Sequence, residues 1–238
     1  MGCALHSAAA GETTPPSCLS RVPVFGQLRA EEVALLHSVM RSRRFSKGET
    51  VFREGDCSDS LFVLSRGVIK LTKLEASGKE HIIRLLFPGD FFGQFSLLQE
   101  KPHYASAAAA DDADVCVIHR EDFLEVLRRS PETAARFMTA LSGQLEEADS
   151  WAAVLTLLET GRRLAKMLLY FRQKSAPGAD EFTLPISKKE LAGVIGATPE
   201  TLSRKLGQLS ADGIAAVSGR RITILNEKEL CRLAGEEQ

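Results

Sequence analysis

The side chains best suited to recognition chemistry lie in the run PETLSRK, from Pro199 to Lys205. If this run is helical, Glu200, Ser203 and Arg204 point outward together with Lys205. Arginine suits the acceptor pair of guanine, and glutamate suits the amino group of cytosine. The pattern therefore predicts contacts with DNA bases and phosphates. The alternative is a solvated surface in which Glu200 complements the helix dipole.

The elements that position these residues are two short helices joined by a tight turn. Ser187 and Glu190 form a capping box for a helix from Lys188 to Ile195. Gly196 supplies the turn, and Thr198 caps a second helix whose first position is a proline. The apolar residues at core spacing are Leu191, Ile195, Leu202, Leu206 and Leu209. This pattern predicts a helix-turn-helix.

A hairpin follows the second helix. The run AAVSGRRITI reads as two short strands around Ser218 and Gly219, with Arg220 and Arg221 at the tip. Paired arginines on such a wing suit phosphate contacts.

The runs PETLSRKLGQLSADG and VSGRRITI resemble the DNA-binding domain of the cyclic-AMP receptor protein and fumarate–nitrate reductase regulator family, or CRP/FNR. The pattern Glu-x-x-Ser-Arg, here Glu200 to Arg204, resembles the FNR branch. That resemblance implies a palindrome of the type TTGAT, four bases, ATCAA. It assigns guanine to Arg204, cytosine to Glu200 and thymine to Ser203. The further DNA-contact candidates are Thr198, Thr201, Lys205, Arg220 and Arg221.

Glycine-punctuated β-rich runs such as VFREGDCSDSLFVLSRGVIKL occupy the middle of the chain. They predict a small antiparallel roll and resemble the CRP/FNR sensor domain. The expected fold class is therefore α+β, with a cyclic-nucleotide-binding-like β-barrel (jelly roll), a long dimerisation helix and a winged helix-turn-helix. The expected boundaries are a cysteine-containing leader at 1–20, the barrel at 21–129, the helix at 130–158 and the DNA-binding domain at 159–238.

Composition agrees with two domains of unequal charge. The chain has 238 residues, 44% of them hydrophobic. Residues 161–238 hold 13 Lys and Arg against 9 Asp and Glu, whereas residues 1–160 hold 17 against 22. The basic end is thus the predicted DNA end. The sequence has no long apolar run and no signal-peptide pattern, so we expect a cytoplasmic protein without a membrane span.

Apolar residues at heptad spacing predict a helix that pairs with a second copy. After Ala134 this seam contains Met138, Leu141, Leu145, Ala148, Ala152 and Leu155. The alternative is a helix packed on its own barrel. Since two DNA half-sites about 34 Å apart favour a binding protein with twofold symmetry, we expect a parallel homodimer on double-stranded DNA. RNA polymerase is a further expected partner.

The resemblance also allows a test of whether the barrel binds a cyclic nucleotide. Cyclic-nucleotide binders of this fold hold ribose with Gly-Glu and phosphate with Arg-Ser, but the corresponding residues here are Gly93-Gln94 and Tyr104-Ala105. Without that arginine, cyclic AMP is not the expected ligand.

Three interpretations of the cysteines stay open. Cys3, Cys18 and Cys116 resemble ligands of an FNR-type [4Fe–4S] cluster, with a fourth ligand such as His6 or a carboxylate. Alternatively, Cys18 and Cys116 form a reversible disulfide. In the third interpretation the cysteines are small buried hydrophobes, and a small molecule in the barrel controls the protein.

The sequence gives little support for an enzymatic function. The sequence has no C-x-x-C motif, no phosphate-binding loop and no nucleophile with a recognisable base partner. We therefore expect a regulator and not an enzyme.

Overall fold

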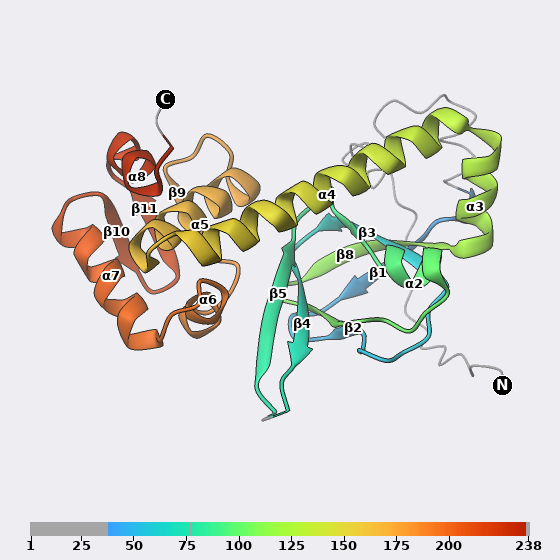
Figure 1. The fold of residues 1–238 in the computed structure, drawn as a ribbon, viewed down its shortest axis with the longest axis horizontal. Helices are drawn as coiled ribbons and strands as arrows, with labels where there is room; N and C mark the ends of the chain where they lie inside the picture. The colour runs from blue at the N-terminus through green and yellow to red at the C-terminus, as the bar shows by residue number, and fades with distance from the viewer. Residues whose placement is uncertain (1–37, 77, 237–238) are drawn as a thin grey trace. The chain divides into compact units, whose positions relative to one another are not determined.

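The computed structural model describes residues 38–76 and 78–236. The chain divides into two compact units after Gln144. Figure 1 shows the ribbon, with the β-rich unit in blue to yellow-green and the C-terminal unit in yellow to red. Each unit is described by itself.

The first unit contains two antiparallel four-stranded sheets. One has the order β1 (Arg41–Phe45), β8 (Ala113–His119), β3 (Ser60–Arg66) and β6 (Phe91–Phe92). The other has the order β2 (Thr50–Phe52), β7 (Ser106–Ala109), β4 (Ile69–Leu74) and β5 (Glu80–Leu86). The helices of this unit are α2 (Gln94–Gln99), α3 (Arg120–Arg129) and the first part of α4 (Pro131–Leu157). The expected jelly-roll class is confirmed, although the described strands form two sheets and not one closed cylinder.

Strand β3 is buried on both faces and separates two apolar clusters. Its Phe62 and Leu64 belong to a cluster that includes residues of the second sheet, such as Ile69. Its Leu61 and Val63 belong to a cluster that includes α3 and α4. Two-sided burial explains why β3 reads as a continuous apolar run without alternation.

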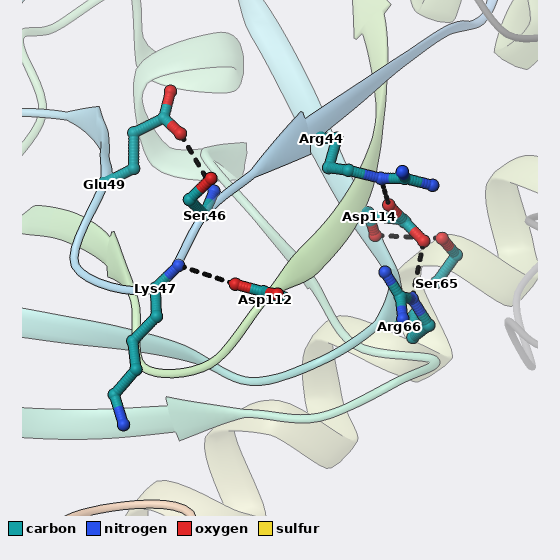
Figure 2. Close-up of polar contacts among 8 residues, drawn as sticks. All are labelled: Arg44, Ser46, Lys47, Glu49, Ser65, Arg66, Asp112 and Asp114. Carbon is teal, nitrogen blue, oxygen red and sulfur yellow. Dashed lines mark hydrogen bonds and ion pairs between the residues drawn. The ribbon is translucent and has the colours of Figure 1, made fainter.

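Polar contacts join neighbouring strands of the first sheet, as Figure 2 shows. The carboxylate of Asp114 on β8 accepts hydrogen bonds from Arg44 Nε of β1 at 2.9 Å and from Arg66 Nε of β3 at 2.7 Å. Burial raises the pKa of Asp114, but the two arginine hydrogen bonds outweigh it, so the pKa lies below its ordinary value. The carboxylate is therefore ionised at neutral pH and bridges three neighbouring strands.

The turn between β3 and β4 depends on a glycine. Gly67 has φ +86°, and a Cβ there would lie 2.3 Å from the carbonyl oxygen of Asp112. Only a residue without a side chain fits this close approach of two backbone segments.

The second unit is a winged helix-turn-helix, as expected. Its helices are the last part of α4 from Leu145, α5 (Thr160–Ser175), α6 (Lys188–Val194), α7 (Pro199–Ala211) and α8 (Glu227–Ala234). Its sheet has the order β10 (Ala215–Ser218), β11 (Arg221–Ile224) and β9 (Glu181–Thr183). The predicted core residues Leu191, Ile195, Leu202, Leu206 and Leu209 are all buried.

Candidate nucleic-acid interface

The predicted caps that position the two helices are present. Ser187 Oγ accepts from the Glu190 N–H at 3.2 Å, and Glu190 Oε2 accepts from the Ser187 N–H at 2.9 Å. Thr198 Oγ1 accepts from the Thr201 N–H at 3.2 Å at the start of α7. Backbone donors that a helix start leaves unpaired are thus satisfied locally.

Arg163 of α5 supports the turn between α6 and α7, a role that sequence reasoning missed. Its Nη1 donates to the carbonyl oxygen of Ile195 at 2.9 Å, and its Nε donates to that of Leu158 at 2.8 Å. The next residue, Gly196, has φ +65°, and a Cβ there would lie 2.9 Å from the same Nη1. The turn therefore depends both on a glycine backbone and on this guanidinium.

The first turn of α7 presents an ionised carboxylate. Hydrogen bonds from the backbone N–H of Glu200 itself and from the Thr198 hydroxyl lower the pKa of Glu200 below its usual range. The carboxyl stays negative at neutral pH, so it can accept a hydrogen bond from a base amino group.

Two further side chains predicted to read bases, Ser203 and Arg204, are exposed. Ser203 and Arg204 lie on the solvent side of α7, while Lys205 is half-buried and donates weakly to Gln208 Oε1 at 3.4 Å. Leu202 and Leu206 on the opposite face are buried. The structure thus brings Glu200, Ser203 and Arg204 together at the start of one helix.

The two wing arginines differ in their contacts. Arg220 is half-buried, and its Nε donates to the carbonyl oxygen of Leu184 at 3.0 Å. Arg221 is more exposed and lies 3.5 Å from the carboxylate of Glu181. Arg220 therefore also holds the wing to the segment after β9.

Helix α4 has two chemically different faces. Thr133 and Phe137 are buried against the first unit, and Leu141 packs on the same cluster. Met138 and Leu145 are 61% and 64% exposed. Ala148 and Ala152 are exposed as well, and Leu155 is half-buried. Most of the predicted seam is therefore an uncovered apolar face, while Leu141 belongs partly to the barrel.

The predicted redox cysteines are only partly described. Cys116 is fully buried in β8, and its sulfur is in a disulfide bond. Cys3, Cys18 and His6 lie outside the described residues. Within 38–76 and 78–236 no group of three or more His, Cys, Asp or Glu residues could hold a metal ion. Burial raises the pKa of Cys231, which disfavours its thiolate.

The positions of the nucleotide pattern line a pocket in the first unit. Gln94 and Tyr104 both contribute to its wall, and so does Arg84 of β5. The pocket thus has a cation after all, although it comes from a strand that the sequence pattern did not single out.

An antiparallel roll combined with a winged helix-turn-helix defines a class of ligand- or signal-responsive DNA-binding proteins. Comparison with known proteins agrees. Residues 42–130 match a cyclic nucleotide-binding domain model, and residues 162–233 match a Crp-like helix-turn-helix domain model.

Relatives cover most of the chain. The cyclic AMP receptor protein of Thermus thermophilus is 35% identical over 193 residues, which are 81% of this chain and 87% of the relative. The transcriptional activator protein FnrL of Cereibacter sphaeroides is 27% identical and covers 87% of this chain and 86% of its own length. The structure of FixK2 from Bradyrhizobium japonicum superimposes with a TM-score of 0.75 at 27% identity, covering 82% of this chain and 97% of FixK2.

The chain therefore belongs to the CRP/FNR family of transcriptional regulators. It is a DNA-binding regulator and not an enzyme. No helix in the described part of the chain is both long and apolar enough to cross a bilayer.

Proposed function

We propose that this regulator reads an FNR-type palindrome, TTGAT, four bases, ATCAA. The observation that carries the proposal is the exposed set of Glu200, Ser203 and Arg204 on the first turns of a capped helix. Arg204 pairs with guanine, Glu200 with the cytosine amino group and Ser203 with thymine. Thr198, Thr201 and Lys205 contact the flanking backbone, as do Arg220 and Arg221 of the wing.

A mobility-shift series on wild-type and mutated half-sites tests this assignment. Arg204→Ala should cost roughly 1–3 kcal/mol of binding free energy and relax the preference at the guanine. Arg221→Ala should weaken all sequences about equally and reduce the salt dependence. Arg220→Ala should also weaken all sequences, and it should destabilise the wing because the bond to Leu184 is lost. Equal loss on every sequence for Arg204→Ala would contradict its base-reading role.

A homodimer is the second part of the proposal. The exposed apolar residues Met138 and Leu145 on α4 support a seam with a second copy. Leu145→Asp should shift sedimentation toward the monomer, whereas Gly143→Asp, on an exposed helix position off the seam, should not. A monomeric wild-type protein at all concentrations would refute the seam.

Redox control is the third part. Either Cys3, Cys18 and Cys116 hold a [4Fe–4S] cluster, or Cys18 and Cys116 form a reversible disulfide. The disulfide-bonded sulfur of Cys116 supports the thiol version. Optical spectra with iron and sulfide analysis, on protein prepared without oxygen and then aired, distinguish the two. If wild type, Cys18→Ser and Cys116→Ser all bind operator DNA identically in air and in reductant, redox control fails.

A cytoplasmic location and a contact with RNA polymerase complete the proposal, because a DNA-bound regulator of this family acts at promoters. The alternative is control by a small effector in the barrel, with cysteines that do not sense. The pocket lined by Arg84, Gln94 and Tyr104 favours this second candidate. Cyclic AMP is not the expected effector, since Tyr104 occupies the position of the phosphate-binding arginine.

A further inference from the structure

The pocket in the first unit combines aromatic walls with polar side chains. Phe52, Phe92 and Tyr104 contribute rings, and Arg84, Gln94 and His103 contribute hydrogen-bonding groups. The cavity between these side chains is only about 10 Å³, room for about one water molecule. Side chains must therefore move apart to admit any larger ligand.

His103 is the first sign of a missing partner in this pocket. Its side chain is only 4% exposed, and its ring stacks on Phe52 with centroids 3.5 Å apart. Its Nδ1 lies 2.9 Å from the hydroxyl of Ser96. Its Nε2 is the one buried polar side-chain atom without a hydrogen-bond partner in the described part of the chain. Buried polar atoms are nearly always paired, so this nitrogen indicates a site for an incoming group.

The charge state of His103 limits what that group can be. Burial lowers its pKa to about 4, so the imidazole is neutral at pH 7. If the Ser96 hydroxyl donates to Nδ1, the single ring proton is on Nε2, the buried atom without a partner. His103 then offers a hydrogen-bond donor without a positive charge.

Gln144 of α4 shows what kind of atom accepts hydrogen bonds from the other two polar residues. Its Oε1 receives hydrogen bonds from Arg84 Nη1 and from Gln94 Nε2, both at 3.0 Å. Its Nε2 donates to the carbonyl oxygen of Phe91 at 3.1 Å. Two donors on one oxygen, one of them a guanidinium, form the arrangement that a carboxylate oxygen prefers.

Resting on the second candidate function, an effector site in the barrel, we propose that this pocket binds a small aromatic carboxylate, which takes the donors of Arg84 and Gln94 from Gln144 and accepts a third hydrogen bond from His103. One guanidinium and two neutral donors match a single negative charge better than the double charge of a phosphate. The surrounding rings suit a flat apolar body. Binding then competes directly with the hydrogen bonds that attach α4 to β5 and α2.

Calorimetric titration of the full chain with benzoate tests the proposal, with benzamide as the uncharged control of the same shape. Benzoate should bind at least about tenfold more tightly than benzamide, because benzamide lacks the charge-assisted bonds. Arg84→Gln and His103→Phe should each weaken benzoate binding, by about tenfold for the arginine. Lys47→Met, on the turn after β1 and outside the pocket, should leave it unchanged.

Gln144→Ala tests the competition. Removal of the internal acceptor should tighten benzoate binding several-fold, whereas a merely structural role would leave the affinity unchanged or weaken it. If Arg84→Gln does not fold, Gln94→Glu replaces it, since a second carboxylate of the same shape should repel benzoate.

Absence of benzoate binding, equal binding of benzamide, or full affinity in both Arg84→Gln and Gln94→Glu would overturn the proposal. These titrations use no DNA, so their failure is distinct from a failure of operator recognition.

Discussion

Replacement of Arg163 by methionine should destabilise the second unit by about 2 kcal/mol. Its guanidinium donates to the carbonyl oxygens of Ile195 and Leu158. Hydrogen bonds that involve a charged group contribute about 1.5–3 kcal/mol each. Arg163 is half-buried, so water can replace part of each bond, and about 1 kcal/mol per bond is the better figure. Methionine retains the apolar stem, so the loss reports the guanidinium alone.

Urea unfolding followed by circular dichroism at a fixed protein concentration measures this change. The midpoint for the second unit should fall without a change in slope. Arg162→Met is the matched control, because Arg162 is the neighbouring arginine of the same helix and is exposed. Equal midpoints for the two variants would refute the assignment of Arg163 as the support of the turn.

Two further perturbations test the first unit. Gly67→Ala should lower the free energy of unfolding by more than about 3 kcal/mol, since it adds a backbone clash to the strain of a positive φ. Gly78→Ala has open space around its Cβ, so it should lower the free energy of unfolding only by the strain, about 1–2 kcal/mol. Thermal unfolding of both variants checks this difference. Asp114→Asn should cost under about 1 kcal/mol at pH 7, because its two arginine partners are mostly exposed. The folded pKa of Asp114 is lowered, so its stabilisation is present above the unfolded pKa near 4 and is lost as the pH falls through the folded value. Wild type and Asp114→Asn should therefore converge in unfolding free energy at acid pH, and a constant difference down to pH 2 would contradict this.

Local rules predicted the DNA-reading unit well. The capping box of Ser187 and Glu190, the Thr198 cap and the strands around Ser218 depend on residues within a few positions of one another, so sequence spacing determines them. The fold class followed from the same kind of signal, repeated along the barrel.

The interactions that sequence analysis missed join distant segments. Arg163 and Ile195 are 32 positions apart, and Arg84 and Gln144 are 60 apart. No spacing rule connects such pairs, because only the packed fold brings them together. Gln144 itself was a usable signal for the Arg84 contact, because a polar residue on the inner side of a mostly apolar helix needs a buried hydrogen-bond partner.

The stacked ring of His103 gives this protein a built-in spectroscopic reporter. Its protons lie close to the face of Phe52, where the aromatic ring current moves their magnetic resonance signals upfield. The chain has five histidines, so a displaced imidazole signal is simple to assign. With a pKa of about 4, this signal should keep a constant chemical shift across neutral pH. Any movement of the peak on addition of a compound then reports an event inside the barrel.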